Sequence, residues 1–283
     1  MMQHVLDVAT KNHLIDELGD NTFIHKDLNK LLKSPFYYSL SAKNLLLRFI
    51  PVSKFTLKDA TKLMKRLVFV AKKEDITHPV NMWIVPCNSK RYFPKSNELF
   101  DKKHINGGYT YYQSETHDTY IYRLEDLQKV AIHELLHNSK LDNTHTDATE
   151  LLEPFKISPH SPYPLLVNEA SIDAWAMFYH LKCVAHDYKL QFKELFKKEL
   201  EFSLALSHKL QGYHKGLWKE NTNTYAYIRL KTCIMFYWSK FIKCDNLVKF
   251  LKKYNTSPKF LEAINLTEIP KGNSCKITLY GSI

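Results

Sequence analysis

Glycine is scarce in this sequence, with seven residues among 283. It is the default residue where the backbone takes a positive φ, so we expect few tight glycine turns and favour helices joined by polar loops. The two common glycine-rich phosphate-binding patterns, G-x-G-x-x-G and G-x-x-x-x-G-K-[ST], do not occur. A nucleotide-binding loop of either type is therefore not expected.

Long apolar runs are also missing, because none approaches the ~20 residues that a membrane-spanning helix needs. The first residues, MMQHVLDVATKNH, lack the basic-then-apolar pattern of a secretory signal. The five cysteines are scattered, odd in number and form no C-x-x-C pair. We therefore expect reduced thiols and a cytoplasmic, reducing compartment.

Acidic residues are outnumbered, 29 against 40 basic residues, which leaves a formal net charge of +11. Such a balance is compatible with an acidic protein partner or with nucleic acid. The lysines are dispersed, however, and no arginine-rich or RNA-binding aromatic motif accompanies them. A lysine-rich solvated surface is the simpler interpretation.

Residues 1–75 are predicted to be mostly helical. The segment TLKDATKLMKRLVFVAKK places Leu57, Ala60 and Met64 at helical spacing, with Thr56 as the expected N-cap. PVNMWIVP has the length and composition of a strand, and GGYTYYQSETHDTYIYR predicts a hairpin or two adjacent strands.

The second half of the chain is predicted to be helical. Four prolines make residues 141–164 a long loop, and LLVNEASIDAWAMFYHLKCVAHDY is the next strong helix. Helices then follow to about residue 264. We predict one α+β, mostly helical domain over residues 1–283: a helical part (1–75), a site core with a small sheet (76–187) and an all-helical C-terminal part (188–283).

The stretch VAIHELLHNSK contains His133, Glu134 and His137 in the order H-E-x-x-H. Residues four apart lie on one face of a helix, so both imidazoles can bind one zinc ion while Glu134 activates a water molecule. We expect this helix to begin near Leu124, with Glu125 and Asp126 in its first turn. The plain alternative is a surface helix that carries two histidines.

A catalytic zinc needs a third protein ligand and one open position. The metzincin pattern fails, because Lys140 and Asn143 stand where it has glycine and histidine. The remaining candidates for the third ligand are Asp142, His145, Asp147, His160 and Glu169.

H-E-x-x-H followed by N-E-x-x-x-D, in VNEASIDAWA, resembles the gluzincin superfamily of zinc metallopeptidases, whose type member is thermolysin. The resemblance covers about residues 105–185 and implies a zincin-like core. It makes Glu169 the third zinc ligand, Asp173 the partner of His133 and Glu134 the general base. The proline-rich loop over 141–164 is longer than in the thermolysin pattern.

The same resemblance implies two further parts of a peptidase site. An edge strand holds the substrate backbone, and GGYTYYQ, with Gly108 and Tyr109, is the candidate. A tyrosine or histidine from the helical half stabilises the oxyanion. We favour Tyr227, in NTNTYAYIRLK, over the alternatives Tyr225, His208 and His214.

Three segments, INGGYTYY with the motif helix, NEASIDAWA and NTNTYAYIRLK, are together similar to uncharacterised metallopeptidase-like proteins of large DNA viruses. This likeness implies a viral protein of the host cytoplasm or the virion. The expected function is a zinc-dependent peptidase acting on a peptide or protein. The alternatives are a basic nucleic-acid-binding or virion structural protein with zinc used only for stability, and a metal-free interaction domain.

Overall fold

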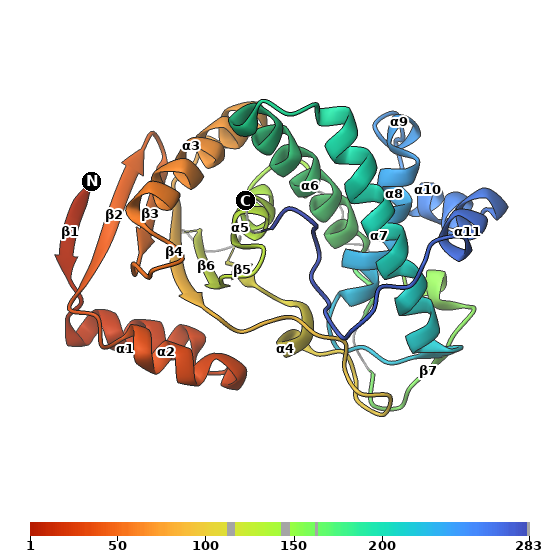
Figure 1. Ribbon diagram of the computed structural model, residues 1–283, viewed down its shortest axis with the longest axis horizontal. Coiled ribbons are helices and arrows are strands. Elements are labelled where there is room, and N and C mark those ends of the chain that lie inside the picture. The colour runs from red at the N-terminus through yellow and green to blue at the C-terminus, as the bar shows by residue number, and fades with distance from the viewer. Residues whose placement is uncertain (112–116, 143–147, 162–163, 282–283) are drawn as a thin grey trace. The chain divides into compact units, whose positions relative to one another are not determined.

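The computed structural model describes residues 1–111, 117–142, 148–161 and 164–281 (Figure 1). The chain divides into two compact units. The first comprises Met1–Lys90 and Asn106–Lys140, and the second comprises Arg91–Ile105 and Leu141–Gly281. Helices and a mixed sheet occur together, so the chain is α+β as predicted. That it forms a single domain stays a prediction.

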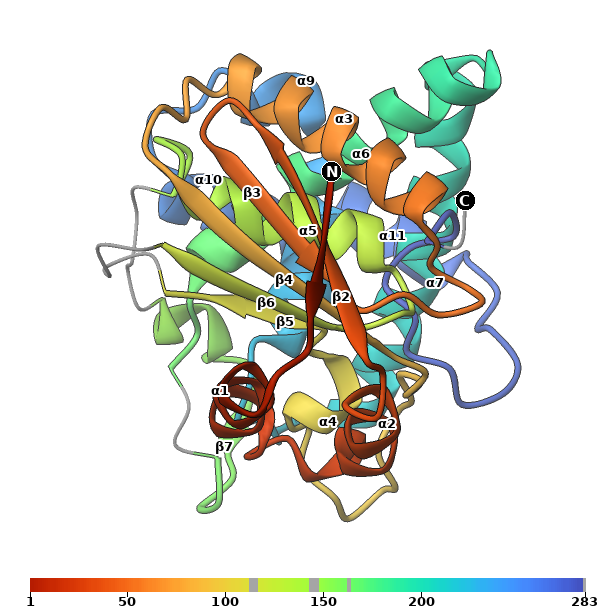
Figure 2. The same ribbon diagram turned by 90° about the vertical axis from the view of Figure 1, so that its left-hand side faces the viewer.

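The first unit contains a six-stranded sheet (Figure 2). The central pairs β3–β4 and β4–β6 are parallel, whereas β1–β2, β2–β3 and β5–β6 are antiparallel. In sheet order, the strands are β1 (Met2–Val5), β2 (Phe36–Ala42), β3 (Leu45–Phe49), β4 (Val80–Cys87), β6 (Asp118–Arg123) and β5 (Gly108–Thr110).

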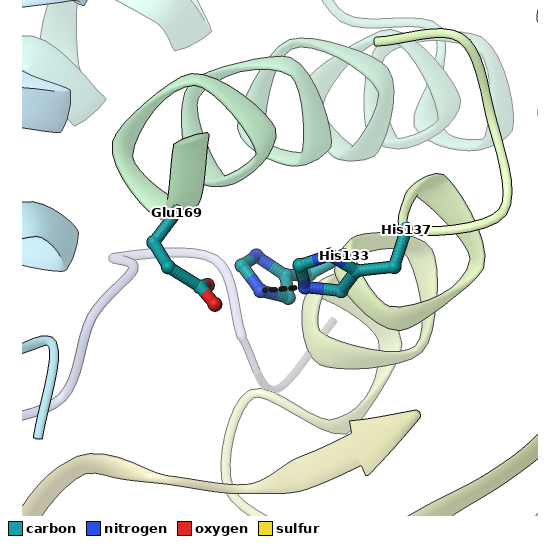
Figure 3. Close-up of side chains that lie close together, drawn as sticks. All are labelled: His133, His137 and Glu169. Atoms are coloured by element: carbon teal, nitrogen blue, oxygen red, sulfur yellow. Dashed lines mark hydrogen bonds between the residues drawn. The ribbon is translucent and has the colours of Figure 1, made fainter. Parts of the chain in front are cut away.

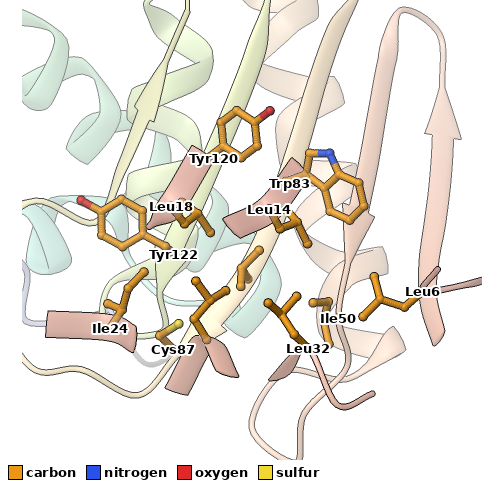
Figure 4. Packing of buried hydrophobic residues seen from close by; sticks show 12 residues of the cluster. Leu6, Leu14, Leu18, Ile24, Leu32, Ile50, Trp83, Cys87, Tyr120 and Tyr122 are labelled. Atoms are coloured by element: carbon orange, nitrogen blue, oxygen red, sulfur yellow. The ribbon is translucent and has the colours of Figure 1, made fainter. Parts of the chain in front are cut away.

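Helices cover both faces of this sheet. One face packs against α1 (Val8–Leu18), the 3₁₀ turn η1 (Thr22–Ile24) and α2 (His25–Leu31), and the other against α3 (Leu57–Lys73) and α5 (Leu127–Leu136). Because side chains alternate along a strand, Trp83 and Cys87 of β4 both face α1 and α2 (Figure 4). Val85 belongs to the same cluster of buried residues. Strand β4 is therefore buried on both sides, as its continuous apolar sequence indicates.

Several predicted elements of this unit are confirmed. Helix α3 starts at Leu57, with a capping box between Thr56 and Asp59. Strand β4 is present, and β5 and β6 are adjacent strands, as predicted, and pair antiparallel. The prediction that residues 1–75 are mostly helical is wrong for β1, β2 and β3. In β3 every second residue is buried, the pattern of a strand with one covered face.

The scarcity of glycine does not prevent tight connections. Lys43, between β2 and β3, has φ 54°, and Asp75, Lys189 and Lys215 take similar values. These polar residues adopt a left-handed conformation that favours glycine. Among the described glycines only Gly216 and Gly272 have a positive φ, so the expectation of few tight glycine turns is confirmed.

The second unit is mainly helical and also contains a two-stranded parallel pair, β7–β8. Because β8 lies within residues 188–283, the prediction of an all-helical C-terminal part is wrong there. The label η3 marks a π-helix, and η2 a 3₁₀ turn. No helix among the described residues is both long and apolar enough to cross a membrane. The elements are α4 (Lys102–Ile105), η2 (Thr149–Leu152), β7 (Lys156–Ile157), α6 (Val167–Tyr188), α7 (Phe192–His214), β8 (Leu217–Trp218), η3 (Ala226–Leu230), α8 (Lys231–Phe236), α9 (Trp238–Phe241), α10 (Leu247–Tyr254) and α11 (Pro258–Asn265).

Candidate metal centre

The motif helix α5 begins at Leu127, three residues later than predicted. Asp126 has a left-handed backbone with φ 60°, which a continuous helix does not allow. The N–H of Leu124 still bonds to the carbonyl oxygen of Cys87, at 2.8 Å, and so belongs to the end of the sheet. Glu125 and Asp126 therefore precede the first turn.

Two imidazoles meet at the end of α5. Nε2 of His133 lies 3.1 Å from Nε2 of His137, which caps the helix (Figure 3). Two nitrogens held 2.0–2.1 Å from a tetrahedral zinc are ~3.3 Å apart, so this donor pair fits one zinc ion. His133 is only 5% exposed, and the neighbouring apolar residues Val130, Leu135 and Leu136 are buried.

Glu134 is held by a strand residue that the sequence motif does not reveal. Oγ1 of Thr110 lies 3.0 Å from Oε2 of Glu134 and 3.2 Å from its main-chain oxygen. Oγ1 of Thr119 is 3.2 Å from the same Thr110 oxygen. Because side chains alternate along β5, the pattern of GGYTYY could have placed Gly108 and Thr110 on one face. Only the packing of α5 on that face shows what Thr110 contacts.

Gly108 permits the close approach of α5 to β5. A Cβ atom at this position would lie 2.8 Å from Cδ1 of Ile121, 2.8 Å from the carbonyl oxygen of Tyr120 and 3.2 Å from Cγ of Glu134. Any larger residue must push the strand or the Glu134 side chain away. β5 is the last strand in the sheet order. Its predicted role in holding a peptide backbone stays a prediction.

Tyr109 points to the opposite face of the sheet from Glu134. Its hydroxyl donates to the carbonyl oxygen of Glu17, at 2.8 Å, and its ring stacks on Tyr120 at 5.2 Å. Burial raises the pKa of this phenol well above its usual range. A contribution of Tyr109 to substrate binding can therefore come from its backbone, not from its side chain.

Glu169 and Asp173 lie one turn apart near the start of α6, as predicted. Glu169 is half-buried, whereas Asp173 is 1% exposed. Nζ of Lys231 lies 3.8 Å from Oδ2 of Asp173 and donates to the carbonyl oxygen of Ile277 at 3.1 Å. Sequence reasoning missed this buried lysine. The predicted pairing of Asp173 with His133 stays a prediction.

His133 and His137 belong to the first unit and Glu169 to the second, and the role of Glu169 as the third zinc ligand stays a prediction. Two imidazole nitrogens and a carboxylate oxygen form a donor set typical of catalytic zinc.

The other predicted third ligands have different surroundings. Oδ1 of Asp142 accepts a hydrogen bond of 2.8 Å from the side-chain amide of Asn168. His160 is exposed. His145 and Asp147 lie outside the described residues.

Tyr227, the favoured oxyanion donor, is the second residue of the π-helix η3 and is half-buried. The helix that Tyr227 is predicted to open is therefore a π-helix at this position, whose turn is wider than that of an α-helix. Tyr225 is 6% exposed, and its hydroxyl accepts a hydrogen bond of 3.3 Å from the amide of Asn255. Burial raises the pKa of Tyr225, so its phenol stays protonated at neutral pH.

The two histidine alternatives to Tyr227 already have partners. Nδ1 of His208 lies 2.8 Å from the carbonyl oxygen of Thr267. Nε2 of His214 lies 3.0 Å from Oε1 of Glu220, and both side chains are fully buried. Burial raises the pKa of Glu220, and the hydrogen bond from His214 opposes that shift. His214 is therefore part of a buried structural pair.

No family model matches this chain, and neither the curated proteins nor the solved structures include a significant match.

Proposed function

We propose that this chain is a zinc-dependent peptidase of gluzincin type, with His133, His137 and Glu169 as the zinc ligands. The observation that carries the proposal is the pair of Nε2 atoms, 3.1 Å apart on a buried helix that also carries Glu134. A mixed sheet that leads into this helix, and the N-E-x-x-x-D pattern on α6, support a zincin-like core.

Zinc, when bound at these residues, supplies Lewis acidity that polarises a substrate carbonyl and lowers the pKa of a water molecule towards ~7. Glu134 takes the proton of the attacking water and delivers it to the leaving amine. Oγ1 of Thr110 lies 3.0 Å from Oε2 of this carboxylate and so helps to orient it. The backbone of β5 binds the extended peptide, and the Tyr227 hydroxyl donates to the oxyanion.

Metal content is the first test. Purified protein should contain about one zinc per chain, and His133→Ala and His137→Ala should each lose it. Glu134→Gln is the matched control, because it changes the same helix without removing a ligand and should keep its zinc. A chain that holds no zinc, or two histidine variants that both retain it, would contradict the proposal. Full occupancy in Glu169→Ala would assign the third ligand to residues 141–160.

Cleavage of a mixed peptide library, followed by mass spectrometry, tests the chemistry. Zinc-loaded protein should cut peptides, and zinc-loaded Glu134→Gln should be slower by ~10²–10⁴-fold or more, because it lacks the general base. Equal rates for the two proteins would refute the assigned base.

A cobalt-substituted protein separates a catalytic site from a stability-only site. An open coordination position allows acetohydroxamate to bind, which changes the visible spectrum of the cobalt. An unchanged spectrum, together with stoichiometric metal and no cleavage, would favour the basic structural protein over the peptidase.

A further inference from the structure

The second unit contains a pocket of about 290 Å³. Its walls come from η2, the end of α7, the π-helix η3 and the turn between α10 and α11. Most of the lining is apolar and includes Leu151, Pro154, Phe155, Leu210 and Leu261. Small-molecule sites are typically apolar pockets of about 300–1,000 Å³ with a few convergent polar groups.

The charged group in this wall is Arg229, which is 6% exposed. Its Nε donates to Oδ1 of Asn255 and its Nη2 to the carbonyl oxygen of Asn255, both at 3.0 Å. The guanidinium carbon lies 4.7 Å from the centre of the Phe260 ring. Nη1 is buried and makes no hydrogen bond to any residue that the structure describes.

Arg229 has no carboxylate partner among the described residues. The ionisable groups that act on it are the phenol of Tyr225 and the thiol of Cys233, both of which are neutral at physiological pH. Burial lowers the pKa of Arg229, and the neighbouring Tyr225 and Cys233 oppose that shift only in part. A buried cation without an anion is costly, so proteins rarely keep one unless something neutralises it.

Arg229 also lies in an uncommon backbone conformation. Ala226–Leu230 form a π-helix, a wide turn that occurs mostly as a single bulge and is frequent at functional sites. This turn places Tyr225 and Arg229 together in the pocket wall, with Asn255 hydrogen-bonded to both.

We propose that this pocket binds a small monocarboxylate with a short apolar chain. Its carboxylate compensates the charge of Arg229, and its apolar chain lies against Leu151, Leu210 and Leu261. An arginine fork suits a carboxylate, because the two planar groups can form parallel hydrogen bonds. The proposal does not depend on the peptidase function.

Calorimetric titration of the full chain with hexanoate and hexanamide tests this site. The two probes differ in charge but hardly in size, so hexanoate should bind and hexanamide should bind far more weakly. Arg229→Gln should weaken hexanoate binding by roughly 10- to 100-fold, as expected for a lost charged hydrogen bond. Arg229→Lys should lie between, because it keeps the charge without the fork. Lys252→Gln is the matched control for charge, since Lys252 is exposed and pairs with Glu150 at 2.8 Å.

Leu261→Trp fills the pocket and leaves Arg229 unsubstituted. It should therefore abolish binding, and it tests the site even if the Arg229 variants fail to fold. Because carboxylates also bind zinc, the titration is repeated with His133→Ala. Binding that persists there supports the pocket, and binding lost there assigns hexanoate to the metal centre and overturns the proposal. Equal affinity for the two probes, or wild-type affinity in folded Arg229→Gln, would also overturn it.

Discussion

Oγ1 of Thr110 lies 3.0 Å from Oε2 of Glu134 and thereby joins the last strand of the sheet to the motif helix. The same hydroxyl lies 3.2 Å from the main-chain oxygen of Glu134. A single hydroxyl has one proton, so it donates to one of these acceptors at a time. Thr110 is therefore placed to orient the carboxylate that we assign as the general base.

Thr110→Val should lower kcat of the proposed peptidase roughly tenfold and leave KM almost unchanged, because valine keeps the shape but loses a hydrogen bond to a charged group. Steady-state kinetics on a cleaved peptide measure both constants. Thr110→Ser should restore kcat. Thr119→Val should have a smaller effect, because the Thr119 hydroxyl contacts Thr110, at 3.2 Å, rather than Glu134. A raised KM with normal kcat would instead assign Thr110 to substrate binding.

Gly108→Ala should destabilise the protein by about 1–3 kcal/mol, because its new methyl group overpacks the interface between β5 and α5. The added Cβ would meet Cδ1 of Ile121 at 2.8 Å and Cγ of Glu134 at 3.2 Å. Urea unfolding measures the change. Gly212→Ala is the control: nothing lies within 4 Å of its added Cβ, and it lies within helix α7. That variant should be about 0.5–1 kcal/mol more stable, and equal effects of the two substitutions would contradict the packing argument.

Asp173→Asn should destabilise the protein by about 3–5 kcal/mol, because it leaves the Lys231 ammonium buried without its carboxylate. Asp173 and Lys231 are each 1% exposed, and their charged atoms are 3.8 Å apart. The double variant Asp173→Asn, Lys231→Met should regain much of this stability. Urea unfolding of the single and double variants gives the comparison.

The same variants also test the predicted support of His133 by Asp173. Zinc affinity should fall about 10–100-fold in Asp173→Asn if that carboxylate orients the imidazole. It should stay low in the double variant, even where stability returns. Competition with a chelator measures the affinity. Recovery of both stability and affinity would show that Asp173 acts only through Lys231.

His104 should make stability depend on pH. Its side chain is fully buried, and burial lowers its pKa below the usual 6.5. Below pH 6.5 the unfolded chain therefore binds a proton at His104 that the folded chain does not bind. The stability that the neutral His104 side chain contributes is complete above pH 6.5 and is lost as the pH falls towards the folded pKa. The loss can reach about 1.4 kcal/mol per pH unit.

Urea unfolding of wild type and His104→Asn at pH 7.5, 6.5 and 5.5 measures this contribution. The asparagine side-chain oxygen can still accept the 2.9 Å hydrogen bond from the Asp101 amide that Nδ1 receives. The variant should lose less stability on acidification than the wild type. Parallel pH curves for the two proteins would show that His104 does not titrate in this range.

Helices α3 and α6 could be predicted from sequence because the interactions that define them are local. Thr56 caps a helix whose apolar residues recur at helical spacing, and the capping carboxylate of Asp59 is three residues away. His133 and His137 could likewise be paired by counting, since four residues make about one turn. The predicted start of α5 is nevertheless three residues too early. The spacing of apolar residues reveals neither the left-handed backbone of Asp126 nor the hydrogen bond from Leu124 to the end of β4.

By itself, then, the sequence determined the α+β class, the motif pair on one helical face and the strands next to it. Only the tertiary structure decided that residues 36–49 form a hairpin and that β4 lies between β3 and β6. It also decided that Thr110 holds Glu134 and that Lys231 lies beside Asp173. The physical reason is range: a helix is made by residues four apart, whereas sheet register and buried ion pairs join residues far apart in the chain and depend on how whole elements pack.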